Sequence, residues 1–469
     1  MKFKAFTIIC LTATLFSCNK WLDIDLADKV TEEKLFSTPQ GYTEALAGVY
    51  SSMASSSLYG MKLTMQNLDL LAQYYSYDGI ATSYEKMRNY DYEDASSQTT
   101  ILGIWRDLYS AIGGANNIIK WAGKDATVLT PEMRNQVLGE ALALRAYLHL
   151  DLIRMFCPDV KNSPKAQGIP YNTEFGVSLP PMYTVEEAVQ LVVNDLKEAE
   201  KMLSNDPVTT VKPFELTNKN DADKYVARIN LYGVKALLAR VSLIRGDKTN
   251  AIKYAQEVVE SGKFKLLDFA STDKSDKEID ILFSDEHIFS LRNKNLSDYT
   301  ISLHYPEITA TSTRFAYLPF ANISTLYEGN NDDVRNIKWF SVATGYFTKF
   351  NVDNKEKFFP KMPMIKLSEM YLILAECFLG KDDLQALSYI NTLRDHRIRN
   401  NSHWGYLTME YIIQEIKREF IGEGQLWYAY KRLNTGIPTS SGVIGVVPPS
   451  DKVFVFPIPL KEIETGNRN

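Results

Sequence analysis

The chain has 469 residues, of which 45% are hydrophobic and 23% charged, and its formal net charge is −5. These proportions are ordinary for a globular protein, and the length allows one large domain or two or three smaller ones. A mildly acidic chain without a dense lysine/arginine run is not expected to bind nucleic acid.

The N-terminus has the parts of a secretory signal in their usual order. Lys2 and Lys4 precede an apolar run at residues 5–16, and Cys18 follows it. This run is shorter than the about 20 residues that span a bilayer as a helix. The sequence LFSC at 15–18 resembles a lipobox. We predict a lipoprotein-type signal peptide at 1–17 and a lipid on Cys18, and loss of the two lysines takes the charge from −5 to −7. The alternative is a buried N-terminal strand or helix.

Two amphipathic helices are predicted in the middle of the chain. Residues 138–156 carry leucines four residues apart, which form one apolar stripe. Thr184 with Glu187 three residues later is a capping box, so a second helix is expected from there to about Leu203.

Helical hairpins are predicted in the second half. Residues 235–261 and 370–394 each read as an apolar helix, a turn containing glycine and aspartate, and a second helix with alanine at the crossing. Both resemble tetratricopeptide-type hairpins, which stack to bury a shared core. Residues 408–433 are a further candidate, interrupted at Gly422 and Gly424.

The stretch at about 263–365 differs from its surroundings. It has polar turns, many aromatic residues and two short β-leaning pieces, at 286–291 and 315–320. We predict an irregular, loop-rich insertion over the helical scaffold, and such loops commonly carry function.

Motifs of catalysis and metal binding are missing from the sequence. It has no phosphate loop, H-E-x-x-H, C-x-x-C or G-x-S-x-G. The missing motifs are weak evidence against an enzyme, since a pair of glycosidase carboxylates would leave no linear motif. We expect no enzyme activity, no cofactor and no metal ligands among the candidate residues, and whether a structural metal ion is bound is left open. His149 is interpreted as structural. Cys157 and Cys377 are expected to be buried thiols, and whether they pair is left open.

Aromatic side chains offer candidates for binding a sugar, because their rings stack on pyranose faces. The first set is Tyr74, Tyr75, Tyr77 and Tyr84 together with Asp78, in a loop-like region; the alternative is that these tyrosines pack around the helix at 68–71.

The second set of candidates is Tyr305, Tyr317 and Trp339, in the predicted insertion. Trp105 and Trp427 lie on helical stripes and are assigned to the core.

Five segments together resemble the SusD/RagB family of outer-membrane nutrient-binding lipoproteins. They span the chain in the family's order, at residues 18–50, 104–119 (IWRDLYSAIGGANNII), 139–156 (GEALALRAYLHLDLIRMF), 417–434 (KREFIGEGQLWYAYKRLN) and 455–467 (VFPIPLKEIETGN).

The resemblance implies a mainly α fold, in which four tetratricopeptide-like hairpins form a scaffold under an irregular ligand-binding face. It implies an N-terminal region at 18–220 and a C-terminal region at 221–469. The family's shared motifs, which look structural, match here at Arg145, Tyr147, Arg418, Glu419, Gly424 and Pro457.

The resemblance also implies a function. The expected protein is a surface-exposed, lipid-anchored glycan-binding protein of the outer membrane, whose partner is a SusC-like TonB-dependent transporter. Asn19 follows the cysteine, so the aspartate that retains lipoproteins at the inner membrane is absent. Two alternatives remain: a peptide-binding module that gates the transporter or captures a non-glycan nutrient, and a surface hydrolase.

Overall fold

The computed structural model describes residues 31–76, 84–124, 127–176, 179–271, 280–305, 320–321, 323–352, 357–440 and 445–466. The predicted signal peptide and Cys18 lie outside these residues. Within them, no helix is long and apolar enough to cross a membrane.

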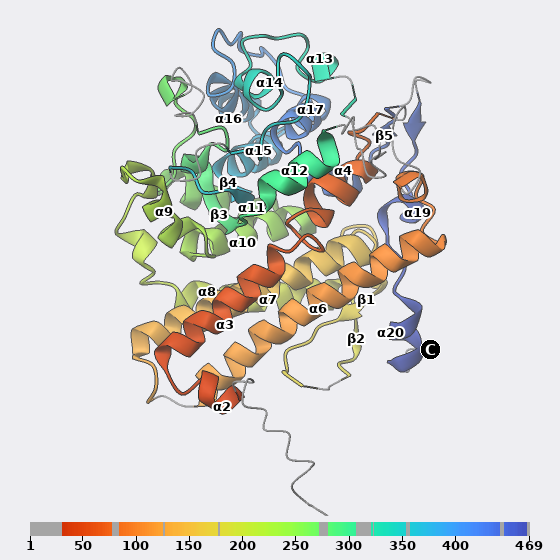
Figure 1. Ribbon diagram of the computed structural model, residues 1–469. Coiled ribbons are helices and arrows are strands. Elements are labelled where there is room, and N and C mark those ends of the chain that lie inside the picture. The colour runs from red at the N-terminus through yellow and green to blue at the C-terminus, as the bar shows by residue number, and fades with distance from the viewer. Residues whose placement is uncertain are drawn as a thin grey trace, which may run out of the picture.

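The fold is mainly α-helical, as predicted (Figure 1). The first half contains α2 (Glu32–Leu35), α3 (Pro39–Met53), α4 (Asn67–Leu71), α5 (Glu85–Arg88), α6 (Ala95–Lys124), α7 (Pro131–Phe156), α8 (Val185–Met202) and α9 (Lys219–Val226). The second half contains α10 (Leu231–Arg245), α11 (Lys248–Glu260), α12 (Leu296–His304), α13 (Ile323–Leu326), α14 (Val334–Lys338), α15 (Leu367–Phe378), α16 (Asp383–Asp395), α17 (Met409–Glu419), α18 (Leu426–Leu433), α19 (Asp451–Phe454) and α20 (Leu460–Thr465).

In the part of the chain that the structure describes, strands are few and short. They form three antiparallel pairs, β1 (Gln167–Pro170) with β2 (Met182–Thr184), β3 (His287–Arg292) with β4 (Lys361–Lys366), and β5 (Ile437–Pro438) with β6 (Val446–Val447).

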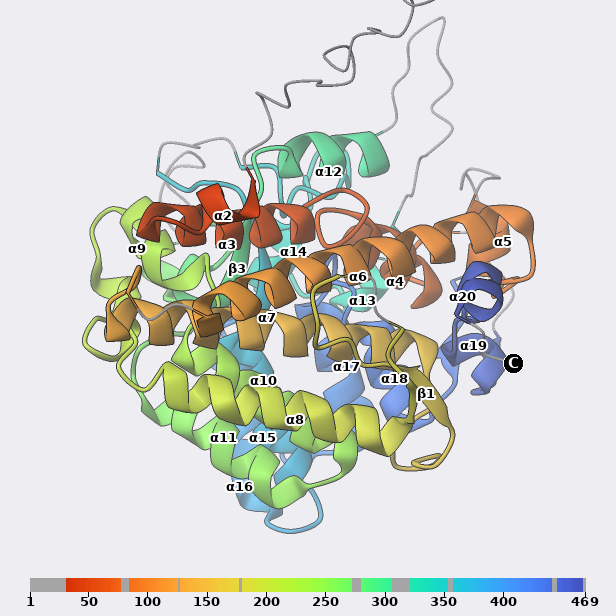
Figure 2. The same cartoon turned by 90° about the horizontal axis from the view of Figure 1, so that it is seen from below.

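Helices that follow one another in the chain pack side by side and build the scaffold. Figure 2 shows α3, α6, α7 and α8 as neighbouring rows, with α10, α11, α15 and α16 continuing the stack. The helix predicted at 138–156 is the C-terminal part of α7, and the capping box between Thr184 and Glu187 starts α8. Both predictions are confirmed.

The predicted hairpins are the pairs α10–α11, α15–α16 and α17–α18, and α6–α7 is a fourth pair of the same kind. Their turns follow from local chemistry. Gly246 ends α10 in the left-handed region (φ 76°), and the side chain of Asp247 then accepts a hydrogen bond from the backbone N–H of Asn250 to cap α11. Ala251 and Ala255 are fully buried, so the paired helices approach closely.

The larger part of the insertion predicted at about 263–365 lies between two paired strands. Residues 293–360 lie between β3 and β4, which pair with each other and are almost entirely buried. The β-leaning piece at 286–291 is confirmed as β3, whereas most of the piece at 315–320 lies outside the described residues. The insertion is more helical than predicted, because it contains α12, which buries Leu296, Thr300 and Leu303 on one face. One of these three buried residues is a threonine, so the spacing of hydrophobic residues alone does not indicate the helix.

The two cysteines behave as buried thiols, because Cys157 and Cys377 are both free and buried. Burial raises the pKa of each to about 12, which keeps them protonated and unreactive. His149 is structural, as expected. Its ring stacks on Tyr171 at 3.8 Å, Nδ1 lies 2.9 Å from the carbonyl of Arg145, and Nε2 accepts from the N–H of Asn172.

Candidate functional site

The first two candidate tyrosines lie in the core. Tyr74 and Tyr75 follow α4 directly, and their exposed fractions are 3% and 0%. The hydroxyl of Tyr74 donates to the carbonyl of Lys417 at 2.6 Å, and that of Tyr75 donates to the carbonyl of Met65. Burial raises the pKa of both phenols well above 10. The rings of Tyr74 and Tyr75 therefore present no face to solvent. The alternative interpretation, in which these tyrosines pack around the helix at 68–71, has the same feature.

The two aromatic candidate segments meet at Tyr75 and Phe320, although these residues are 245 positions apart in the sequence. Tyr75 forms an antiparallel bridge with Phe320, and the N–H of Ala321 donates to the carbonyl of Tyr74 at 2.9 Å. The ring of Phe320 lies 4.8 Å from that of Tyr75. Tyr75 of the first set and Phe320, which lies between Tyr317 and Trp339 of the second, are therefore neighbours, a relation that sequence reasoning could not reveal.

Among the candidates that the structure describes, Tyr84 and Tyr305 are partly exposed. The side-chain amide of Gln66 donates to the hydroxyl of Tyr84 at 2.7 Å, and burial raises the pKa of Tyr84. The ring of Tyr305, just after α12, lies 5.0 Å from that of Tyr346 at an angle of 57°. Half-buried rings next to an amide are groups that can stack on a sugar ring and bond its hydroxyls.

Trp339 belongs to the core rather than to a surface. It is fully buried, its indole N–H donates to the carbonyl of Ile281 at 2.8 Å, and the ammonium of Lys349 lies 3.7 Å from its ring centre. Trp105 and Trp427 are also buried, as predicted. Tyr77, Asp78 and Tyr317 lie outside the described residues, and the ligand role of the whole set stays a prediction.

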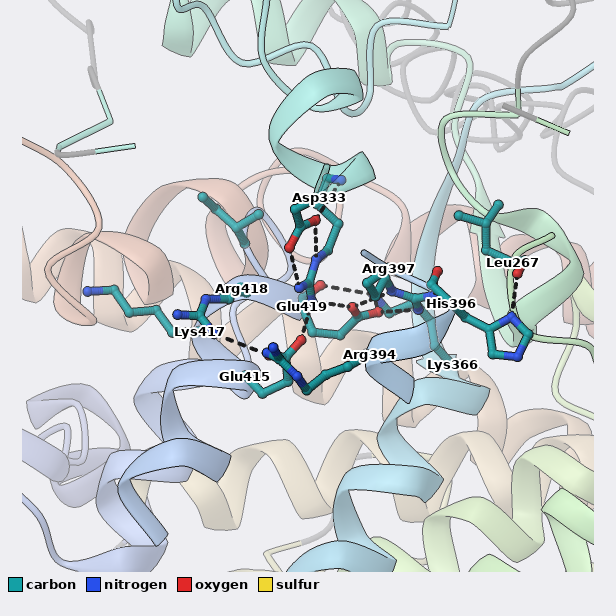
Figure 3. Close-up of polar contacts among 12 residues, drawn as sticks. Leu267, Asp333, Lys366, Arg394, His396, Arg397, Glu415, Lys417, Arg418 and Glu419 are labelled. Atoms are coloured by element: carbon teal, nitrogen blue, oxygen red, sulfur yellow. Dashed lines mark hydrogen bonds and ion pairs between the residues drawn. The ribbon is translucent and has the colours of Figure 1, made fainter. Parts of the chain in front are cut away.

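A group of buried charges lies between α14 and α17 (Figure 3). Glu419 of α17 is its centre: burial alone would raise the pKa of this carboxyl, but contacts with Arg397, Lys366 and Arg335 hold it well below its usual value. We call the set the ionic cluster, and its members are Glu286, Asp333, Arg335, Lys349, Lys366, Arg394, Arg397, Glu415, Arg418, Glu419 and Glu423.

The ionic cluster joins the insertion to the scaffold. Arg335 of α14 makes a two-pronged contact with Asp333, and its remaining nitrogen donates to Glu415 at 2.6 Å and to Glu419 at 3.1 Å. Lys349, also in the insertion, donates to Glu423 at 2.6 Å. Only part of this cluster was anticipated, because Arg418 and Glu419 were among the residues expected to be structural.

Other motif residues also have structural roles. Arg145 forms a bidentate pair with Asp195, both bonds being 2.7 Å long. Gly424 adopts φ 70°, and its N–H, like that of Gly422, donates to the buried carboxylate of Asp69. Burial raises the pKa of Asp69 well above its usual value.

Cavities occur elsewhere in the fold. The largest described, about 440 Å³, lies against α6 and is lined by Trp105, Arg106, Tyr109 and Asn172 among others. A second, of about 310 Å³, adjoins α9, and a third, of about 100 Å³, lies among α7, α10 and α15. None of the three is lined by a predicted ligand residue. Within the described ranges, no three His, Cys, Asp or Glu side chains cluster as a metal site.

Comparison with known families decides the identity of the scaffold. Residues 20–231 match the family model described as "Starch-binding associating with outer membrane", and residues 299–464 match the SusD family model. The chain belongs to the SusD/RagB family. Members of this family are binding proteins rather than enzymes.

Individual relatives agree with this membership. SusD-like protein P2 of Formosa agariphila is 24% identical over 93% of this chain and 92% of its own length. A SusD superfamily protein of Bacteroides thetaiotaomicron superposes with a TM-score of 0.70 at 21% identity, covering 92% of this chain and 98% of its own. Surface glycan-binding protein A of the same species, solved with laminarihexaose, has a TM-score of 0.67 at 18% identity, covering 91% and 98%. These structures share the SusD/RagB fold with this chain.

Proposed function

We propose that this SusD/RagB protein binds a glycan at the cell surface and delivers it to a SusC-like TonB-dependent transporter. The observation that carries the proposal is the meeting of Tyr75 and Phe320, which brings the bases of two aromatic-rich segments together on one scaffold. The name of the matched family model, which mentions starch and the outer membrane, supports the ligand class and the location.

The proposed ligand surface uses the half-exposed rings of Tyr84 and Tyr305, with Tyr77, Asp78 and Tyr317 in the adjoining segments. Tyrosine suits this role because its ring is rigid and its hydroxyl can bond a sugar hydroxyl. Tyr74, Tyr75 and Trp339 would support these segments from the core, where the structure places them.

The proposed location rests on Cys18. Several acyl chains on one cysteine hold a protein stably at a membrane, whereas a single chain is marginal. A tethered binding protein stays at high local concentration near its transporter, which favours repeated docking.

Binding of the purified mature protein to a panel of soluble polysaccharides tests the proposal. We expect retardation in a native gel containing the correct polysaccharide, and weaker retardation for Tyr84→Ala and Tyr305→Ala. Tyr183→Ala is the matched control, because Tyr183 is also partly exposed but lies on β2, which pairs with β1 and with neither candidate segment. Absence of binding to every polysaccharide, with co-purification of the transporter, would instead support the peptide-binding or gating alternative.

A further inference from the structure

A hydrogen bond at the first candidate segment fixes the direction in which a tyrosine can donate. The side-chain amide nitrogen of Gln66 donates to the hydroxyl oxygen of Tyr84 at 2.7 Å. Gln66 is 7% exposed, whereas Tyr84 is partly exposed. An amide N–H that donates to a phenol occupies a lone pair of the phenol oxygen, so the hydroxyl proton of Tyr84 points away from Gln66.

The hydroxyl proton of Tyr84 has no acceptor among the described residues, where the bond from Gln66 is the one hydrogen bond of this hydroxyl. Tyr90 differs, because its hydroxyl accepts from the amide of Gln73 at 3.2 Å and also donates to the carbonyl of Leu71 at 2.8 Å. Burial raises the pKa of both phenols, so both stay protonated near neutral pH. Tyr84 therefore keeps a donor that the protein does not use, whereas Tyr90 does not.

The backbone that carries this amide is a π-helical turn, Lys62–Gln66, which runs directly into α4. Turns of this kind are rare and are frequently found at functional sites. Two hydroxyl groups bond to the backbone around the turn: that of Thr64 donates to the carbonyl of Tyr59 at 3.2 Å, and that of Tyr75 donates to the carbonyl of Met65. The buried Tyr75 therefore helps to hold the turn whose last residue is Gln66.

We propose that Gln66 is a positioning residue of the glycan site, which directs the hydroxyl proton of Tyr84 at an oxygen atom of the ligand. This inference rests on the proposed function and deepens it by naming the group that is recognised. Because the donor is a neutral hydroxyl, the complementary group is a sugar oxygen that accepts, either a hydroxyl or a ring oxygen. The bond from Gln66 fixes the phenol before the ligand arrives, so binding loses little conformational entropy.

Three substitutions alter this donor in different ways. Tyr84→Phe keeps the ring and removes the hydroxyl. Gln66→Glu keeps the shape of the side chain, but an ionised carboxylate can only accept, so it takes the hydroxyl proton of Tyr84 for itself. Gln66→Met removes the amide and offers no acceptor in its place.

Isothermal titration calorimetry of the mature protein with amylopectin, laminarin, galactomannan and arabinoxylan, at about pH 8.5, measures the effect. The net contribution of one neutral hydrogen bond predicts roughly 2- to 10-fold weaker binding for Tyr84→Phe and for Gln66→Glu. Gln66→Met should lose less, because the proton of Tyr84 can still reach the ligand. The double variant Gln66→Glu/Tyr84→Phe should bind no more weakly than Tyr84→Phe, since both substitutions remove the same donor.

The pH dependence of binding separates positioning from a structural role. Once protonated, the carboxyl group that Gln66→Glu introduces can donate to the phenol as the amide does. Burial raises the pKa of a carboxyl group, so a large share of this one is protonated at about pH 5. Gln66→Glu should therefore bind closer to the wild type at about pH 5 than at about pH 8.5, whereas Tyr84→Phe should be weakened equally at both.

Gln256→Glu is the matched control and should bind as the wild type does, because Gln256 of α11 also donates to a phenol, that of Tyr389 of α16, at 3.3 Å, and neither belongs to a candidate segment. If Gln66→Glu binds as tightly as the wild type at both pH values, Gln66 does not position the donor, while the proposed function stands. If Gln66→Glu is weakened equally at both pH values, its effect is structural and the inference is wrong. If the wild type binds none of the four polysaccharides, the proposed function fails, and the inference fails with it.

Discussion

Replacing Arg335 by methionine should destabilise the protein by leaving a buried carboxylate without a counter-ion. Methionine fills a similar volume without charge. Glu415 would keep Arg394 and Arg418, and Glu419 would keep Arg397 and Lys366, so both retain cationic neighbours. Asp333 is different, because Arg335 is its partner in the ion pair and the residue is only 2% exposed.

The expected magnitude follows from that orphaned charge. Removing one partner of a buried ion pair typically costs about 3–5 kcal/mol. Unfolding entropy of about 2.1 cal/mol/K per residue gives about 1 kcal/mol/K for a chain of this length, so the melting temperature should fall by about 3–5 °C. The double variant Arg335→Met/Asp333→Asn removes both charges and should recover much of the loss.

Urea denaturation monitored by circular dichroism, with a thermal melt beside it, measures these differences. Arg106→Met is the matched control, since Arg106 pairs with Asp107 at 2.8 Å but is 72% exposed in its side chain. Exposed pairs contribute about 0–1 kcal/mol. A loss for Arg335→Met no larger than that of Arg106→Met, or a double variant less stable than Arg335→Met, would refute the argument from an orphaned carboxylate.

Three further outcomes are expected. Gly424→Ala should lose more than about 1 kcal/mol in urea denaturation, because the new Cβ would lie 2.4 Å from the carbonyl oxygen of Leu63 at φ 70°; Gly262→Ala, at φ 61° with open space around it, controls for backbone strain alone. Burial lowers the pKa of His149 from 6.5 to about 3, so below pH 6.5 the unfolded chain binds a proton that the folded chain does not. Stability should therefore fall by up to about 1.4 kcal/mol per pH unit from this group, and the slope of unfolding free energy against pH should be shallower by that amount in His149→Gln. Cys18→Ala should move the protein from the membrane fraction to the soluble fraction, and unchanged retention there would contradict the lipid anchor.

The scaffold was predictable because its signals are local. Apolar spacing, the capping box at Thr184 and the turn residues Gly246 and Asp247 each act within a few residues, and each appears in the structure as expected. The family resemblance supplied the order of the segments. Neither the local signals nor the resemblance required knowledge of which distant residues come into contact.

The environment of the candidate residues was not predictable in the same way. A tyrosine pattern does not say whether a ring faces solvent or core, and Tyr74 is buried through a contact with Lys417, 343 residues away. The ionic cluster was missed for a similar reason. Charged residues are usually exposed, and its members come from separate segments that become neighbours only when the insertion folds onto α17.

The position of the ionic cluster suggests why so many charges are buried together. Glu415 and Glu419 belong to α17. The backbone carbonyl of Lys417, in the same helix, accepts the hydrogen bond from the hydroxyl of Tyr74. Arg335 ties the insertion to the middle of this same helix. A hydrophobic contact there would give comparable stability, but directed ion pairs also fix how the insertion is oriented on α17. On this argument, Arg335→Met/Asp333→Asn would recover stability and still bind a glycan less tightly, because the orientation of the insertion on α17 would no longer be fixed.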